Sequence, residues 1–154
     1  MGQEIERKFL LTGDGWRTQG RSEPYRQGYL STAPGRTVRV RTVGERGYLT
    51  IKGPATGARR AEYEYPIPLA DAQELLATLC EQPLIEKRRT RVEYAGLIWE
   101  IDEFFGENEG LIVAEVELTT EDQPIVRPPW IGAEVTGDHR YGNSHLGRHP
   151  YSRW

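Results

Sequence analysis

Polar and apolar residues alternate with a period of two along much of this 154-residue chain. Successive side chains of a β-strand point to opposite faces, so this period predicts strands. Glycine- and proline-rich turns separate many of these segments. The predicted strands cover residues 3–11, 25–31, 36–43, 48–52, 59–67, 84–94, 97–104 and 111–119.

The period changes to that of a helix after the fifth strand. Leucine and alanine residues follow helical spacing across 69–79, which predicts one amphipathic helix packed on the outside of the sheet. Residues 12–23 read as a polar connection and 128–132 as an extended turn. Two short helical pieces are predicted at 121–126 and 141–146.

Charged residues gather on one face of most predicted strands and recur two positions apart. The first strand carries Glu4, Glu6 and Lys8 opposite Ile5 and Phe9. The later strands repeat this arrangement with Arg39 and Arg41; Lys52; Arg60, Glu62 and Glu64; Lys87, Arg89 and Arg91; Glu100 and Asp102; and Glu115 and Glu117. The strands therefore have one charged face and one apolar face, although the alternation is weaker in the sixth.

Two barrels are compatible with this pattern. In the first, apolar faces fill the interior and charges meet water. In the second, apolar faces pack outward against helices and long loops, and charged faces line a lumen. Charges on a face that meets water need no particular order of sign. Here, however, carboxylates recur two positions apart on some strands and cations do so on others. We therefore predict a mainly β (α+β) fold: an eight-stranded antiparallel closed barrel, or tunnel, with a charged lumen and a few helices packed outside.

The composition predicts a single domain and disfavours nucleic-acid-binding, disulfide-bonded and membrane-spanning proteins. Hydrophobic residues make up 37% and charged residues 28% of the chain, a lean core for one domain spanning residues 1–154. The net charge of −3 disfavours nucleic-acid binding. Cys80 is the single cysteine, which excludes an intrachain disulfide and fits a reducing cytoplasm. No apolar run approaches the ~20 residues that a membrane-spanning helix needs.

The charge pairs indicate what the lumen binds. Paired carboxylates are hard oxygen ligands that suit Mg²⁺ or Mn²⁺, and clustered cations suit a polyanion. The acids outnumber the cations, which is unfavourable in an enclosed space unless metal ions or protons neutralise them. One or two divalent ions would make such a lumen attractive for a triphosphate.

The sequence Glu4-x-Glu6-x-Lys8 near the start of the chain resembles the signature of the CYTH family, the triphosphate tunnel metalloenzymes. The resemblance continues, in the same order, through the other charged positions named above, with the exception of Arg91. It implies an eight-stranded antiparallel barrel that binds triphosphate inside and depends on Mg²⁺ or Mn²⁺. Small single-domain bacterial members are inorganic triphosphatases, which hydrolyse tripolyphosphate to pyrophosphate and phosphate.

The resemblance also implies roles for individual residues. Metal ligands would be Glu4, Glu6, Glu115 and Glu117, and phosphate ligands would be Lys8, Arg39, Arg41, Lys52, Arg60, Lys87 and Arg89. The predicted catalytic group is Lys87 with Glu4 and Glu6. Lys87 would lie near the attacking water, as a base or as a stabiliser of charge. The residues expected to orient the cations or hold a second metal are Glu62, Glu64, Glu100 and Asp102. Arg140 either closes one end of the tunnel or is a surface residue.

Several alternatives stay open from the sequence. Other CYTH members hydrolyse thiamine triphosphate or cyclise ATP as adenylate cyclases, and a non-catalytic polyphosphate- or nucleotide-binding barrel fits the same residues. Nothing resembles a base-recognition element, which favours the smallest substrate. His139, His145 and His149 read as surface residues. Trp130 and Trp154 serve either local packing or the contact of a homodimer.

Overall fold

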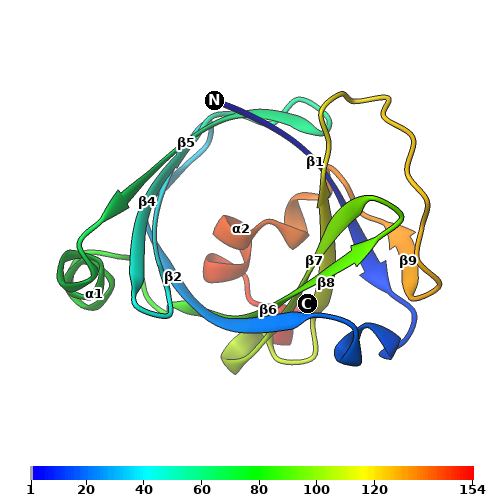
Figure 1. Cartoon of the computed structure of the whole chain (residues 1–154). Helices are drawn as coiled ribbons and strands as arrows, with labels where there is room; N and C mark the ends of the chain where they lie inside the picture. The colour runs from blue at the N-terminus through cyan, green and yellow to red at the C-terminus, as the bar shows by residue number, and fades with distance from the viewer. Residues whose placement is uncertain (1) are drawn as a thin grey trace.

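The computed structural model describes residues 2–154, and its strands close into an antiparallel barrel (Figure 1). The strand order is β5-β4-β3-β2-β6-β7-β8-β1-β9, and pairing of β1 with β5 completes the ring. The strands are β1 (Gln3–Leu11), β2 (Arg21–Ala33), β3 (Arg36–Val43), β4 (Arg46–Lys52), β5 (Arg59–Ile67), β6 (Ile85–Tyr94), β7 (Leu97–Phe104), β8 (Ile112–Glu117) and β9 (Ile131–Glu134).

Two α-helices and four single-turn 3₁₀ helices complete the described chain. They are α1 (Leu69–Thr78), α2 (Asn143–Arg148), η1 (Gly15–Thr18), η2 (Gly106–Asn108), η3 (His139–Tyr141) and η4 (Tyr151–Arg153). None of the helices in residues 2–154 has the length and apolar character needed to cross a membrane.

The predicted fold class and the eight predicted strands are confirmed. Three local predictions are wrong. The predicted connection at 12–23 contains η1 and the first three residues of β2. Residues 121–126 form no helix, because Pro124 lacks a backbone N–H and disfavours helical backbone in the residue before it. Part of the predicted turn at 128–132 belongs instead to a ninth strand, β9, which pairs with β1 outside the ring.

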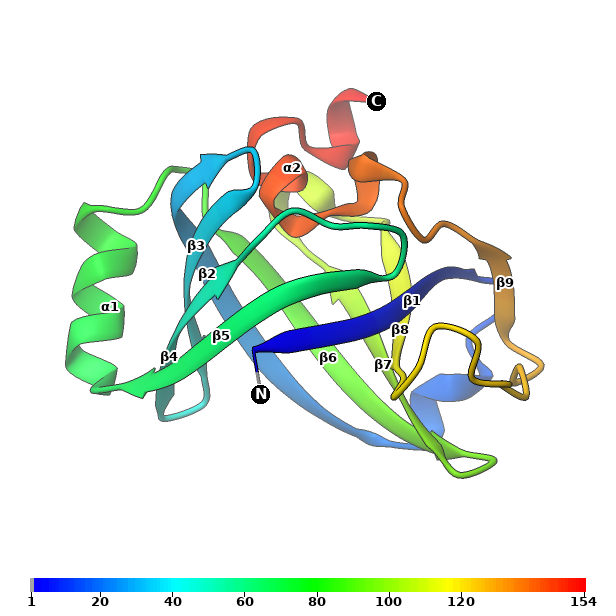
Figure 2. The same cartoon turned by 90° about the horizontal axis from the view of Figure 1, so that it is seen from above.

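The apolar faces of the strands pack outward, as the second kind of barrel requires. The largest cluster lies between the barrel wall and the layer formed by η1 and the segment leading into β9. Its centre is Trp99, fully buried, with the rings of Phe9 and Trp130 at centroid distances of 5.5 and 6.2 Å. On another side, α1 covers β3 and β4 from outside (Figure 2), and Leu76 packs there against Val40.

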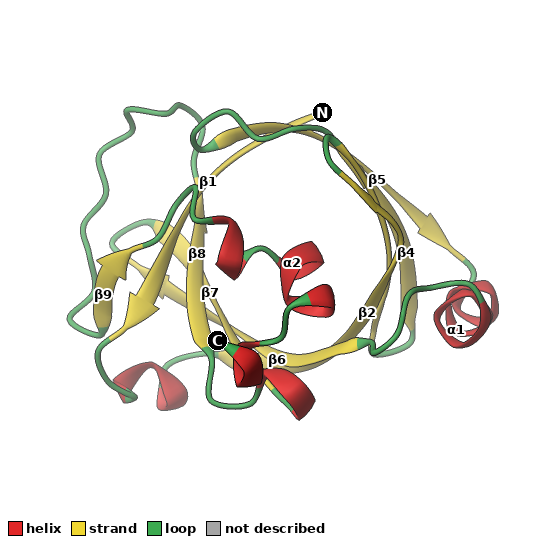
Figure 3. Ribbon diagram, turned by 180° about the vertical axis from the view of Figure 1, so that it is seen from behind, coloured by secondary structure: helices red, strands yellow, loops and turns green. Residues whose placement is uncertain are grey.

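The second helix does not pack outside. Figures 1 and 3 show α2 within one opening of the barrel. The inward-facing residues at this opening are apolar rather than charged. Leu10 lies on the same face of its strand as Lys8, and Ile85 lies on the same face as Lys87. Leu146 of α2 is fully buried in this cluster. Strand alternation alone predicted the lumen but not its apolar end, which α2 occupies.

Gly20, the residue before β2, gives a direct test of how closely the chain packs against β6. A Cβ added at Gly20 would lie 2.0 Å from the carbonyl oxygen of Arg91, a backbone atom that cannot move aside cheaply. We expect Gly20→Ala to lower the free energy of unfolding by about 1–3 kcal/mol in urea denaturation. Gly13→Ala is the matched control, because a Cβ there meets no atom within 4 Å. Its effect should stay within about 0.5 kcal/mol, and equal losses in both variants would contradict the packing described.

Candidate active site

The charged faces of the strands enclose a cavity of about 400 Å³ inside the barrel. Every predicted site residue lines this cavity except Lys87, Asp102 and Arg140. The lining predicted residues are Glu4, Glu6, Lys8, Arg39, Arg41, Lys52, Arg60, Glu62, Glu64, Arg89, Glu100, Glu115 and Glu117. The structure therefore brings together residues that lie more than a hundred positions apart in the chain.

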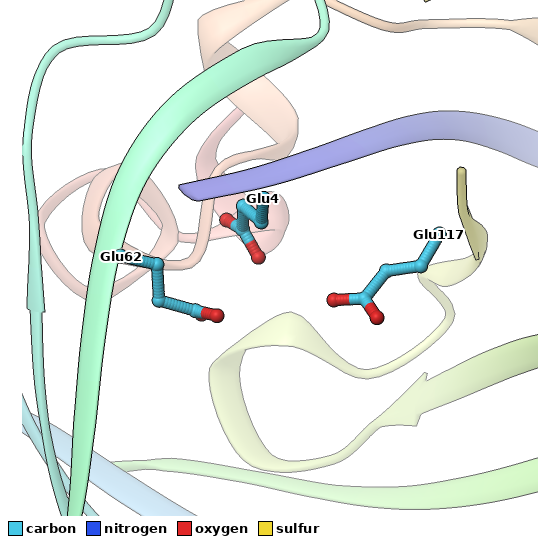
Figure 4. A group of neighbouring side chains, drawn as sticks. All are labelled: Glu4, Glu62 and Glu117. Atoms are coloured by element: carbon cyan, nitrogen blue, oxygen red, sulfur yellow. The ribbon is translucent and has the colours of Figure 1, made fainter. Parts of the chain in front are cut away.

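Three carboxylates converge at one side of the cavity (Figure 4). Oxygen atoms of Glu4 on β1, Glu62 on β5 and Glu117 on β8 all lie within 4.8 Å of one another. Burial raises the pKa of Glu4 even though Lys52 donates a 2.8 Å hydrogen bond to it. Burial and the charge of Glu4 raise the pKa of Glu117 as well. These raised pKa values reflect negative charge that the protein leaves only partly compensated.

This cluster fits a divalent cation, and it differs from the set predicted for the metal. Glu4 and Glu117 belong to both, whereas Glu62 was predicted only in a supporting role. Glu115 instead faces cations: Lys8 and Arg89 lie 3.8 and 3.9 Å from its oxygens. Burial alone would raise the pKa of Glu115, but these two charges lower it to about 2. Its negative charge is therefore already compensated within the protein.

Glu6, the remaining predicted metal ligand, lies opposite Glu117 in the register of β1 and β8. Burial, followed by the charge of Glu115, raises the pKa of Glu6 to about 8. Carboxylate oxygens are the ligands that Mg²⁺ and Mn²⁺ prefer. Glu6 therefore lies in the cavity lining with chemistry suited to a divalent cation, although it is not one of the three carboxylates that converge.

Cations crowd the wall formed by β3 and β6. Arg39 and Arg41 are both buried, and their pairing is incomplete: in residues 2–154 the Nε of Arg39 has no hydrogen-bond partner. Burial, and then the neighbouring charges of Arg39 and Arg89, lower the pKa of Arg41 to about 9. Buried like charges are unfavourable unless an anion joins them. This wall is therefore suited to bind phosphate oxygens.

A buried triad supports this wall from behind. Asp102, 1% exposed, accepts hydrogen bonds of 2.7 and 2.9 Å from Arg89 and one of 2.8 Å from Lys87. Burial would raise the pKa of Asp102, but the two cations hold it well below its usual range. Burial lowers the pKa of Lys87 to about 7, and Arg89 adds to the effect. Lys87 is 2% exposed and does not belong to the cavity lining, so it lies behind that lining.

Tyr25 connects these cations and was not among the predicted site residues. The guanidinium carbons of Arg41 and Arg89 each lie 4.9 Å from its ring centroid, and the Lys87 ammonium lies 5.8 Å away. Such cation–π contacts add to the stabilisation of these buried cations. The sequence could have indicated this role, because Tyr25 lies two positions before Gln27 and therefore on the same inward face of the strand.

Arg140 lies apart from the cavity. Its exposed guanidinium pairs with Asp138 at 2.8 Å and lies over the rings of Tyr141 and Trp154. Its guanidinium therefore lies outside the cavity lining. The three histidines lie near α2, where His145 and His149 stack with ring centroids 4.8 Å apart.

The triad predicts a specific stability defect. Asp102→Asn removes a buried charge and leaves two buried cations short of a counter-ion, so we expect a loss of about 3 kcal/mol in the free energy of unfolding. Glu103→Gln is the matched control on the same strand, because it breaks only the partly exposed ion pair with Arg17. Its cost should stay below about 1 kcal/mol in the same urea denaturation assay.

The pH dependence of stability checks the cause of this defect. Folding lowers the pKa of Asp102, so its charge contributes stability above the unfolded pKa of about 4, and that stability is lost as the pH falls. Asp102→Asn should therefore show a shallower loss of stability below pH 4 than the unmodified chain. Parallel acid profiles would show that the carboxylate is not paired as described.

Comparison with known proteins agrees with this geometry. The sequence profile of the CYTH domain matches residues 2–145. An inorganic triphosphatase from Acetivibrio thermocellus is 50% identical over 154 residues, covering 100% of this chain and 99% of the relative. Another, from Nitrosomonas europaea, is 38% identical over 149 residues, covering 93% and 95%.

Solved structures agree in fold. The crystal structure of an inorganic triphosphatase aligns with a TM-score of 0.65 and 36% identity, covering 93% of this chain and 96% of that one. A conserved hypothetical protein from Pyrococcus furiosus, 20% identical, aligns with a TM-score of 0.61 over 77% of this chain and 80% of its own, which shows the fold alone. On the match to residues 2–145 and the two full-length relatives, the chain belongs to the CYTH family.

Proposed function

We propose that this chain, acting as one domain of residues 1–154, is a metal-dependent inorganic triphosphatase. It hydrolyses tripolyphosphate to pyrophosphate and phosphate inside the barrel. The observation that carries this proposal is the division of the cavity. A wall of buried cations, in which Arg39 and Arg41 are incompletely paired, and a cluster of carboxylates line the same cavity of about 400 Å³. The names of the two full-length relatives support the same activity.

The cation wall binds the substrate. Arg39, Arg41 and Arg89 direct guanidinium groups at the cavity, and arginine can bind phosphate oxygens bidentately. A polyanion among them supplies the negative charge that their crowding lacks, which would raise the depressed pKa of Arg41. The remaining lining cations, Lys8, Lys52 and Arg60, extend the contact along the chain of phosphates.

The carboxylate cluster holds the metal. Glu4, Glu62 and Glu117 would bind Mg²⁺ or Mn²⁺, with Glu6 beside them. The bound ion supplies positive charge that allows phosphate oxygens to approach the carboxylates and that stabilises charge developing during the reaction. Glu64 and Glu100 orient arginines, because their oxygens lie 3.6 Å from Arg39 and 3.4 Å from Arg89.

The reaction is an in-line attack by water on a terminal phosphorus. The arginines neutralise negative charge on the leaving pyrophosphate, which is the main contribution a preorganised site makes to phosphoryl transfer. Lys87 is committed to Asp102 at 2.8 Å and lies behind the lining. We therefore assign to it charge stabilisation and the positioning of Arg89 through Asp102, rather than proton abstraction.

The cellular setting is part of the proposal. We place the enzyme in the cytoplasm, acting on a free small polyanion without a nucleic-acid or membrane partner. The single, buried cysteine and the net charge of −3 support this placement. Trp130 and Trp154 were the two tryptophans considered for a homodimer contact. Trp130 is buried against Trp99, so it serves local packing.

Phosphate release tests the activity. We expect release from tripolyphosphate with Mg²⁺ or Mn²⁺, a lower rate with ATP and thiamine triphosphate, and none after chelation by EDTA. Glu62→Gln should reduce kcat/KM for tripolyphosphate by about 100-fold, because it removes a charged ligand from the metal cluster. The control Glu103→Gln carries the same substitution outside the cavity and should retain activity. Absence of metal-dependent release from all three substrates would leave a binding barrel as the better interpretation.

A further inference from the structure

Asn143 is a polar residue of the cavity that lies outside the charged strand pattern. It is the first residue of α2, the helix lying within one opening of the barrel (Figure 3). Asn143 lines the cavity together with its neighbours Gly142 and Ser144. The C-terminal part of the chain thus contributes a side-chain amide to a site that is otherwise built from strands.

A chain of hydrogen bonds fixes the orientation of this amide. Arg41 donates from Nε to Oε1 of Gln27 at 3.0 Å, and a guanidinium can only donate. The amide nitrogen of the fully buried Gln27 must therefore face the other way, where it donates to Oδ1 of Asn143 at 3.0 Å. The direction of each amide follows from a charged donor at the start of the chain rather than from a free choice of rotamer.

A second donor reaches the same oxygen. Lys87 donates to Asn143 Oδ1 at 3.3 Å while donating to Asp102 at 2.8 Å. An amine nitrogen has two hydrogens available even when it is neutral, so both bonds persist in either protonation state. The oxygen of Asn143 is therefore held by two donors on the barrel wall, and the NH₂ group must point away from them.

That NH₂ group is left free at the cavity. Within residues 2–154, Nδ2 of Asn143 donates no hydrogen bond, although the oxygen of the same amide accepts two. Nδ2 is also absent from the fully buried polar atoms without a partner, so it retains accessible surface in a residue that lines the cavity. A fixed, neutral donor at the edge of a cation wall has the right chemistry to bind a phosphate oxygen.

We propose that Asn143 is a substrate-binding residue whose side-chain NH₂ donates a hydrogen bond to a phosphate oxygen of the bound triphosphate. The proposal rests on the proposed triphosphatase function and extends it to a residue of α2. It gives α2 a second role beyond filling the apolar end of the barrel, because the first residue of α2 then contacts the substrate.

A purely structural role makes a different prediction. If Asn143 only connects α2 to the wall, its oxygen is the functional atom, and any side chain that accepts from Gln27 and Lys87 will serve. Asn143→Asp separates the two readings. The carboxylate keeps an acceptor for both donors, but it replaces the NH₂ group at the cavity with a negatively charged oxygen.

Steady-state kinetics with tripolyphosphate and Mg²⁺ test the proposal. We expect Asn143→Asp to raise KM by about 10- to 100-fold, the effect of losing a hydrogen bond to a charged group and adding repulsion, while its thermal midpoint stays at or above that of the unmodified chain. Gln123→Glu is the matched control, since it also converts an amide to a carboxylate that keeps its acceptor, toward Thr119, outside the cavity. Its KM should be unchanged.

Asn143→Ala provides a second, uncharged variant. It should raise KM by about 10-fold and also lower the thermal midpoint, because Gln27 and Lys87 lose their acceptor. A KM within twofold of the unmodified value in either variant would overturn the proposal while leaving the triphosphatase assignment intact. If the unmodified chain hydrolyses no tripolyphosphate, the proposed function fails first. Equal affinity of the unmodified chain and Asn143→Asp for tripolyphosphate by isothermal titration calorimetry would then overturn the role of Asn143 as well.

Discussion

The structure depends on keeping two groups of like charge close together inside one enclosed cavity. Carboxylates gather where β1, β5 and β8 meet, and guanidinium groups gather along β3 and β6. Each group is unfavourable by itself, as the raised pKa of Glu4 and the lowered pKa of Arg41 indicate. A closed barrel holds them in place because its strands are hydrogen-bonded on both sides and cannot move apart singly.

The outer layers make this inversion of the usual barrel possible. Because the lumen is charged, hydrophobic stabilisation has to come from the outside of the wall, where Trp99, Phe9 and Trp130 pack under η1 and β9 and where α1 covers β3 and β4. Burial of such large aromatic side chains contributes strongly to folding. In the buried triad, Asp102 and Lys87 lie behind the lining, and Asp102 holds Arg89, the member of the triad that lines the cavity.

The alternation of polar and apolar residues predicted the strands, their inward faces and most of the cavity lining, because alternate residues of a strand point to opposite faces. It did not predict which charged side chains of different strands would lie next to one another. Glu62 replaces Glu115 in the carboxylate cluster because β1 pairs with β5 through Glu4 and Arg60, a register that no local pattern specifies. Lys87 shares its parity with Arg89, yet the packing of Tyr25 and Asn143 places it behind the lining.

The C-terminal segment was the least predictable part for a similar reason. Helical spacing indicated a helix near residues 141–146, but only the apolar inward positions Leu10 and Ile85 explain why α2 lies within the barrel. The roles of Gln27 and Asn143 depend on a hydrogen-bond chain that crosses between β2 and α2, which sequence alone does not connect. Residues of this kind can be found only after the elements are placed in space.

The central claim is that the carboxylate cluster and the cation wall together hold one metal–triphosphate complex. Anomalous diffraction from crystals grown with Mn²⁺ and tripolyphosphate tests it most directly. We expect a manganese peak coordinated by Glu4, Glu62 and Glu117, with phosphate density extending from it to Arg39, Arg41 and Arg89. Manganese bound outside the barrel, or triphosphate density that does not contact these arginines, would contradict it.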